Sequence, residues 1–239
     1  AKSGTYTVNL VVKGEGGEAT ATKEITLAAS FLEMLTGVGA NGKTWILSIT
    51  TFTGVDGGGP VQSAMPIVLP AYDNILADYS LDTEYDNEFT FFANGNLSVN
   101  PKNGNVLAGA VFSIINGIIV GEPAYDIGMS AASFSSPLSG TWEVHNTDLI
   151  VDAIADPYTV DIPPVHGNVT FTGKTWISVS GGTFFGILDF PTTAKFIIKE
   201  LTPAKFSVAL FLCGYGYGDD PDMWMLPTNL IHLTFIPKP

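Results

Sequence analysis

The stretch NEFTFFANGNLSVNP, residues 87–101, decides how we interpret the fold of this sequence. Apolar and polar side chains alternate on both sides of an Asn-Gly pair at 94–95. Two alternating runs joined by Asn-Gly are the strongest short-range signal for a β-hairpin. Further Asn-Gly pairs occur at 41–42 and 103–104. The sequence therefore predicts antiparallel strands connected by tight turns.

Runs rich in β-branched and aromatic residues continue outward from this hairpin, and such runs are typical of strands. We expect strands at 43–50, 106–113, 140–144, 148–152, 167–172, 174–180, 194–200, 205–212 and 229–236. Long irregular connections, several of them rich in Gly and Pro, lie between them at 51–80, 121–139 and 153–165. Many antiparallel strands joined by long loops predict an all-β fold, and we expect a β-sandwich of jelly-roll type.

The N-terminal residues predict a separate β-hairpin. Residues 4–12 alternate, the sequence KGEGGE at 13–18 forms the turn, and residues 19–27 form the return strand. An isolated hairpin is marginally stable in water, so we expect this one to pack on the larger domain or on a neighbouring chain. We accordingly divide the sequence into residues 1–28 and 29–239.

A short helix is expected directly after the linker that follows this hairpin. Ser30 and Glu33 have the spacing of a capping box, and Gly37 can end the helix. The pentapeptide GKTWI then occurs twice, at 42–46 and at 173–177. The flanking residues differ, so we interpret each copy as a turn glycine followed by the start of a strand. A duplicated unit is the alternative.

The composition excludes some classes of partner. The sequence has 239 residues, 46% of them hydrophobic, with 10 lysines, no arginine, 23 acidic residues and a net charge of −13. An acidic surface without arginine argues against nucleic-acid binding. No apolar run reaches the roughly 18 residues that a membrane-spanning helix needs. The single cysteine, Cys213, lies in an apolar stretch, where a small buried hydrophobic residue is favoured over a nucleophile.

Several motifs resemble a family of Bacteroidetes envelope proteins: GKTWIL (42–47), YDNEFTFFANG (85–95), FFGILD (184–189), FIIKELT (196–202) and NLIHLTFIPK (229–238). In that family a polycystic-kidney-disease-type (PKD) domain precedes a jelly-roll domain related in fold to concanavalin-like lectins and glucanases. The resemblance implies that residues 1–28 are the last hairpin of an immunoglobulin-like PKD domain and that residues 29–239 form the jelly roll.

The same resemblance implies a location and a class of ligand. It implies an exported protein at the outer-membrane surface or in the periplasm, associated with glycans. Any signal peptide or lipid anchor is then expected upstream of this sequence.

A ladder of carboxylates lies in the sequence DTEYDNEF, with Asp82, Glu84, Asp86 and Glu88 at every second position. On a strand these side chains would share one face. Glu84, Asp86 and Glu88 resemble the catalytic motif of family 16 glycoside hydrolases, which implies Glu84 as nucleophile, Glu88 as acid/base and Asp86 as the orienting residue. A solvated polar face and a calcium site at Asp86 and Glu88 are the other interpretations.

The loop GYGYGDDPDMWMLP (214–227) is the candidate glycan-binding site. It combines aromatic rings, which stack on sugar faces, with carboxylates that accept hydrogen bonds from hydroxyl groups. The residues are Tyr215, Tyr217, Asp219, Asp220, Asp222 and Trp224. The alternative is an ordinary connection in which Trp224 plugs the end of the sandwich.

The sequence thus predicts a cell-surface protein that binds a glycan without catalysis. No cofactor is expected, with calcium as the alternative. A family-16-like hydrolase acting on β-glucans and a structural or adhesive spacer remain the alternative functions.

Overall fold

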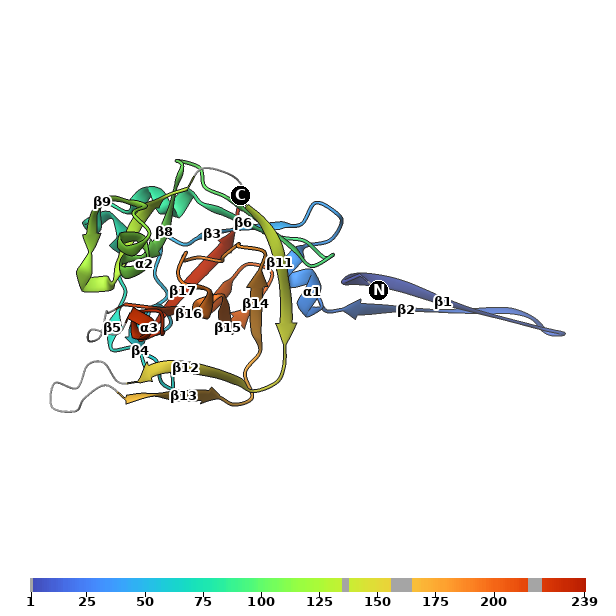
Figure 1. The fold of residues 1–239 in the computed structure, drawn as a ribbon. Coiled ribbons are helices and arrows are strands. Elements are labelled where there is room, and N and C mark those ends of the chain that lie inside the picture. Colours follow the sequence, from blue (N-terminus) through green and yellow to red (C-terminus); the bar gives the residue numbers. More distant parts are fainter. Residues whose placement is uncertain (1, 135–137, 156–164, 215–220) are drawn as a thin grey trace.

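The computed structural model describes residues 2–134, 138–155, 165–214 and 221–239 (Figure 1). Strands account for 49% of the residues and helices for 14%, which confirms the predicted all-β class. The strands are β1 (Gly4–Gly14), β2 (Gly17–Leu27), β3 (Lys43–Leu47), β4 (Gly57–Pro60), β5 (Leu69–Pro70), β6 (Glu88–Phe91), β7 (Asn96–Asn100), β8 (Asn105–Gly109), β9 (Ile119–Ala124), β10 (Met129–Ser133), β11 (Leu138–His145), β12 (Leu149–Ala155), β13 (Val165–Phe171), β14 (Trp176–Ser180), β15 (Lys195–Leu201), β16 (Phe206–Leu212) and β17 (Asn229–Pro237). The helices are α1 (Phe31–Thr36), α2 (Ala110–Ile115) and α3 (Pro221–Trp224), with 3-10 turns η1 (Ile75–Tyr79), η2 (Asp82–Asp86), η3 (Tyr125–Ile127) and η4 (Pro191–Thr193).

The central element is a closed antiparallel β-barrel. In the described part of the chain, eight strands pair in the order β3, β6, β7, β11, β14, β15, β16 and β17. The barrel closes because β17 pairs both with β16 and with β3. Each barrel strand therefore lies beside the barrel strands that precede and follow it along the chain, which is an up-and-down arrangement. Strands β4 and β5 extend the sheet beside β17.

The predicted jelly-roll sandwich is therefore wrong, and with it the resemblance to the envelope family. A sandwich and a barrel both require strands that alternate between a core face and an outer face, so the sequence pattern is the same for the two. The pairing of β3 with β17 distinguishes them, since it joins Trp45 to Pro237 across almost the whole sequence. No local motif encodes that contact.

Aromatic side chains fill the inside of the barrel. Phe185, from the segment between β14 and β15, lies at the centre of this cluster. Its ring centroid lies 4.4 Å from that of Phe235, 4.7 Å from that of Phe196 and 5.1 Å from that of Phe89. An eight-stranded barrel has an interior just wide enough to be filled by side chains or to hold one small ligand. The segment that carries Phe185 occupies much of that space.

A second apolar core lies on the outer face of the barrel. Phe196 and Leu210 belong to the inner core, whereas their neighbours Ile197 and Phe211 belong to the outer one. Successive side chains of a strand point to opposite faces, so β15 and β16 are covered on both sides. Hairpin β12–β13 supplies the outer cover, for example through Phe171, whose ring centroid is 5.6 Å from that of Phe211.

A small sheet with the order β8, β10, β9 lies beside the barrel together with α2 (Figure 1). The strand predicted at 106–113 is correct for 106–109 and wrong after that, because the chain turns into helix α2 at Ala110. A short apolar run is compatible with either element. Here Ser113 donates or accepts a 2.5 Å hydrogen bond with Ser130 of β10, which fixes the helix on the sheet.

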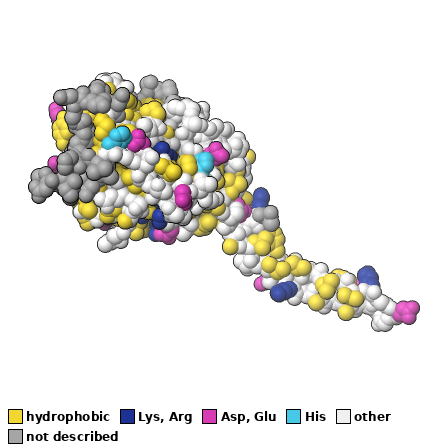
Figure 2. Space-filling model, turned by 60° about the horizontal axis from the view of Figure 1, so that its bottom comes forward, with side chains coloured by type: hydrophobic (Ala, Val, Ile, Leu, Met, Phe, Trp, Pro, Cys, Tyr) yellow, Lys and Arg dark blue, Asp and Glu magenta, His cyan; other side chains and the backbone are white. Residues whose placement is uncertain are grey.

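The predicted N-terminal hairpin is confirmed, and one of the two packing arrangements expected for it is wrong; packing on a neighbouring chain stays a prediction. Strands β1 and β2 pair along their whole length, from Gly4 opposite Leu27 to Gly14 opposite Gly17. Every residue of both strands is exposed, and the hairpin projects away from the barrel (Figures 1 and 2). The hairpin therefore does not pack on the larger domain of its own chain.

Two local predictions are confirmed in detail. Ser30 caps α1, its side chain accepting a hydrogen bond from the Glu33 N–H while Glu33 accepts one from the Ser30 N–H. Strands β6 and β7 form the hairpin predicted around Asn94 and Gly95, with Gly95 at a φ of 86°. Each of these two signals depends on residues that are close together in the sequence, so contacts between distant parts of the chain do not override it.

Candidate ligand-binding pocket

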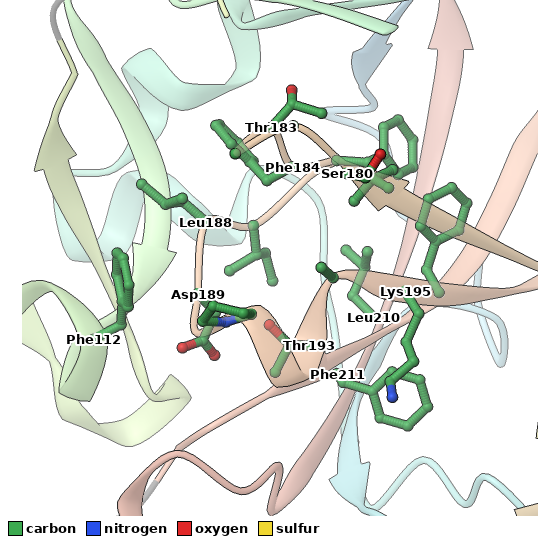
Figure 3. Close-up of a pocket in the computed structure, with 18 residues that line it drawn as sticks. Phe112, Ser180, Thr183, Phe184, Leu188, Asp189, Thr193, Lys195, Leu210 and Phe211 are labelled. Carbon is green, nitrogen blue, oxygen red and sulfur yellow. The ribbon is translucent and has the colours of Figure 1, made fainter. Parts of the chain in front are cut away.

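A cavity of about 460 Å³ opens beside the segment that follows β14. Its wall consists of the end of β14, residues 181–189, the η4 turn, the start of β15 and part of β16, with Phe112 of α2 on one side (Figure 3). Most of the lining side chains are apolar. Figure 3 shows Thr183 and Ser180 at the top of the pocket, with Asp189 at the lower left and Lys195 at the lower right.

The segment 181–189 is held between the barrel and the small sheet. Leu188 exchanges backbone hydrogen bonds with β8: its N–H donates to the Leu107 carbonyl, and its carbonyl accepts from the Gly109 N–H. Phe190 packs edge-on against Phe112 of α2, with ring centroids 5.2 Å apart. The pocket is therefore built on regular elements on both sides.

Asp189 is a buried carboxylate in this wall. Its Oδ2 accepts a 2.7 Å hydrogen bond from the Cys213 N–H, and its Oδ1 accepts a 2.8 Å bond from the Phe190 N–H. Burial raises the pKa of Asp189 to about 7, although the two backbone hydrogen bonds act in the opposite direction. The carboxyl group therefore changes its charge near neutral pH.

Gly109 makes room for this carboxylate. A Cβ at that position would lie 2.9 to 3.1 Å from the carboxyl atoms of Asp189. Since the Asp189 side chain is fixed by two hydrogen bonds, it has little freedom to move aside. A glycine is therefore needed for the close approach of β8 to the pocket wall.

Thr183 and Lys195 supply further polar groups. Thr183 is buried, and its Oγ1 has no hydrogen-bond partner in the part of the chain that the structure describes. Lys195 is half-buried, and burial lowers its pKa. Buried polar groups without partners are uncommon in folded proteins, so the Thr183 hydroxyl marks this pocket as a place where a ligand could complete the hydrogen bonding.

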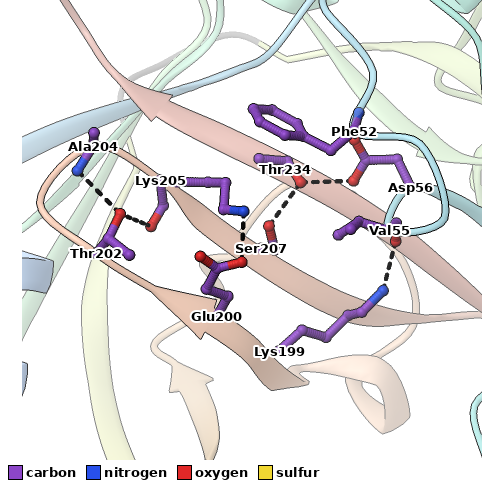
Figure 4. Close-up of polar contacts among 10 residues, drawn as sticks. All are labelled: Phe52, Val55, Asp56, Lys199, Glu200, Thr202, Ala204, Lys205, Ser207 and Thr234. Atoms are coloured by element: carbon purple, nitrogen blue, oxygen red, sulfur yellow. Dashed lines mark hydrogen bonds and ion pairs between the residues drawn. The ribbon is translucent and has the colours of Figure 1, made fainter.

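A second polar cluster lies on the outside of the barrel, under residues 52–56 (Figure 4). Thr234 donates a 2.7 Å hydrogen bond to Asp56 and shares another of 2.8 Å with Ser207. Lys199 donates to the Val55 carbonyl. These groups satisfy one another, so the cluster fastens the connection after β3 to the barrel wall.

His232 lies close to this cluster and beside a smaller cavity of about 100 Å³. Its Nδ1 lies 3.1 Å from the Lys199 ammonium, and its Nε2 is buried without a partner among the described residues. Burial, followed by the charge of Lys199, lowers the pKa of His232 to about 3. This histidine is neutral at physiological pH.

The carboxylate ladder is not on a strand. Residues 82–86 form the 3-10 turn η2, and β6 begins at Glu88, so the shared face predicted for these side chains is wrong. Glu84 is buried, and its Oε2 accepts a 2.6 Å hydrogen bond from Asn87. A turn is favoured there because the 3-10 segment places Tyr85 in the core.

The carboxyl groups of the ladder take separate partners. Glu88 forms ion pairs with Lys102 at 2.8 Å and with Lys238 at 2.5 Å. Although burial acts in the opposite direction, these two lysines hold the pKa of Glu88 below its ordinary value. Burial raises the pKa of Glu84. Glu84 and Glu88 therefore have different partners, and the hydrolase motif stays a prediction.

Much of the predicted glycan loop lies outside the described residues. These are Tyr215, Tyr217, Asp219 and Asp220, and nothing is described of the Asp222 side chain. Trp224 is half-buried at the end of α3. The segment is tied to the pocket by the Thr192 hydroxyl, which donates to the Met225 carbonyl. The glycan site therefore stays a prediction.

The pocket residues are not among the predicted sites, although the position of Asp189 in the sequence is a signal for a buried carboxylate. Asp189 stands in the apolar run FFGILDF, at 184–190. A lone carboxylate inside such a run indicates a buried charge, and buried acidic side chains need specific partners. The other pocket residues, including Lys195, give no local signal.

Among the described residues, no group of three or more His, Cys, Asp or Glu side chains is arranged to hold a metal ion, so Asp86 and Glu88 are not part of such a group. No helix in the described ranges has the length and apolar character needed to cross a bilayer. Comparison with models of known protein families and with curated protein sequences gives no significant match. The proposals below accordingly rest on the geometry of the pocket.

Proposed function

We propose that this protein binds a small, mainly apolar molecule in the pocket lined by β14, residues 181–189, η4, β15 and β16, with Phe112 of α2 on one side. The observation that carries the proposal is a cavity of about 460 Å³ beside a barrel whose interior is otherwise filled with aromatic side chains. Ligand pockets typically have volumes of about 300–1,000 Å³, with apolar walls and a few polar groups. Here the polar side chains are those of Ser180, Thr183, Asp189, Thr193 and Lys195.

The pocket wall favours binding because contacts within the protein already fix its conformation in the absence of a ligand. Its backbone is hydrogen-bonded to β8 through Leu188, and Asp189 is fixed by two backbone N–H groups. A pre-formed site loses less conformational entropy on binding than a flexible one. The cell-surface prediction came from the family resemblance that the fold contradicts, and the glycan prediction came from that resemblance together with the residues of loop 214–227. Both remain predictions and do not support this proposal.

A fluorescence titration with the neutral apolar dye N-phenyl-1-naphthylamine tests the proposal. We expect saturable binding to the full chain and a loss of about tenfold or more in affinity in Ala194→Phe, whose ring would fill the cavity that Ala194 lines. Ala204→Phe is the matched control, because Ala204 is exposed outside the pocket.

Circular dichroism and thermal unfolding check that each variant folds. If Ala194→Phe does not fold, Leu188→Phe on the opposite wall takes its place. Absence of saturable binding, or equal binding by the pocket-filling variant and wild type, would refute the proposal.

A further inference from the structure

The charge of Lys195 indicates which kind of ligand the pocket accepts. Among the described residues, Lys43, Lys195 and Lys199 are lysines whose pKa is lowered by burial. Taking an ammonium group out of water is costly unless other groups replace its hydration. A comparison of their partners therefore shows which of the three ammonium groups has no acceptor from the protein.

Lys43 and Lys199 both have acceptors. The Lys43 ammonium donates to the Met34 carbonyl at 2.9 Å and to the Pro203 carbonyl at 2.7 Å. The Lys199 ammonium donates to the Val55 carbonyl (Figure 4). It also lies 3.1 Å from Nδ1 of His232. In both cases the protein replaces part of the water that burial removes.

Lys195 differs from both. Lys195 is one of the residues that line the pocket, and within the described part of the chain its ammonium has no hydrogen bond or ion pair. Asp189, the carboxylate in the same wall, does not pair with it, since the two Asp189 oxygens accept from Cys213 and Phe190. Figure 3 shows Asp189 and Lys195 extending on opposite sides of the pocket.

We infer that the ligand is an amphiphile with an apolar body and a single carboxylate, which pairs with the ammonium of Lys195. The inference rests on the proposed binding function and specifies its ligand class. One unpaired ammonium matches one negative charge, and charge-assisted hydrogen bonds are about twice as strong as neutral ones. A doubly charged phosphate would bring a second negative charge into a partly desolvated pocket with no further cation on its wall in the described residues.

Displacement of the neutral dye by three probes with the same tail tests the inference: decanoate, decanol and decylamine. For wild type we expect decanoate to displace the dye at about tenfold lower concentration than decanol, and decylamine to be the weakest. In Lys195→Met, which keeps the aliphatic stem, we expect decanoate and decanol to differ by less than about twofold. Lys195→Arg should restore the preference because it restores the charge.

Lys174→Met is the matched control for the net charge. Lys174 precedes β14 outside the pocket, so its loss should leave the decanoate preference unchanged. Equal displacement by decanoate and decanol in wild type, or a preference that survives Lys195→Met, would refute the carboxylate inference and leave the binding proposal standing. Failure of all three probes and of the dye to bind would instead refute the binding proposal itself.

Discussion

Two hairpins of this protein have the same sequence pattern and opposite environments. In β6–β7 the inward side chains Phe89, Phe91, Leu97 and Val99 are at most 2% exposed. In β1–β2 the apolar side chains of one face, Tyr6, Val8, Leu10 and Val12, are 42% to 60% exposed. Alternation therefore predicts a strand with two unlike faces. It does not predict whether another element covers the apolar face.

The difference has a simple energetic basis. Burying apolar surface contributes about 25 cal/mol per Å², and β6–β7 obtains this stabilisation from the other barrel strands. The N-terminal hairpin obtains it only from cross-strand neighbours such as Tyr6 and Ile25, which contribute about 0.2–1 kcal/mol per pair. We therefore expect substitutions in the two regions to have very different effects on stability.

The largest effect is expected for Phe185→Ala, which removes the ring at the centre of the barrel. Loss of a buried phenylalanine typically lowers the free energy of unfolding by about 3–5 kcal/mol. Tyr6→Ala, on the exposed hairpin, should change it by less than about 1 kcal/mol. Urea unfolding measures both. Similar losses for the two variants would contradict the contrast between the regions.

The second effect is a pH dependence that arises from Asp189. Because its pKa is raised to about 7 in the folded protein, the folded state binds a proton more tightly than the unfolded state does. The stabilisation that the protonated Asp189 side chain contributes is complete below about pH 4 and is lost as the pH rises through about 7. At about 1.4 kcal/mol per pKa unit, the loss amounts to about 4 kcal/mol.

Unfolding free energies of wild type and Asp189→Asn between pH 4 and 8 test this prediction. Other groups titrate in both proteins: the raised pKa values of Asp56 and Glu84 make stability fall with pH, whereas the pKa of His232, lowered to about 3, makes it rise up to about pH 6.5. The difference between the two curves is the contribution of Asp189. Parallel curves would show that this carboxyl group does not titrate in that range.

A smaller effect is expected for Gly109→Ala. The added methyl group would lie within about 3 Å of the Asp189 carboxyl group, and such overpacking typically costs about 1–3 kcal/mol. Gly16→Ala in the turn of the N-terminal hairpin is the matched control, since a Cβ there meets no atom within 4 Å. We expect its thermal midpoint to match that of wild type. Equal thermal midpoints for Gly109→Ala and Gly16→Ala would show that the pocket wall shifts to accommodate the added methyl group at little energetic cost.

The smallest effect is expected for deletion of residues 1–27. The hairpin is exposed throughout, so its removal should leave the thermal midpoint of the barrel within about 2 °C of its original value, equivalent to less than about 1 kcal/mol. Calorimetry measures this midpoint. A markedly lower midpoint would show that the hairpin stabilises the barrel through contacts beyond the hydrogen bond from the Ser3 N–H to Glu33.

The parts of the fold that could be predicted have causes within a few neighbouring residues. The capping box at Ser30, the hairpin at Asn94 and the N-terminal hairpin all belong to this group. The closure of the barrel could not be predicted, because the contact between β3 and β17 joins opposite ends of the sequence. The pocket could not be predicted either, since Asp189, Lys195 and Phe112 of α2 come to line one cavity only in the folded chain.

The repeated pentapeptide GKTWI shows where the sequence by itself stops being informative. Both copies begin a strand, β3 and β14, as the turn glycine and the Thr-Trp-Ile sequence predict. Yet Trp45 is fully buried inside the barrel, whereas Trp176 faces the outer core and Ile177 points inward. Five identical residues thus determine the strand. The face that turns inward is decided by the register of each strand with its neighbours, because a shift of one residue exchanges the two faces.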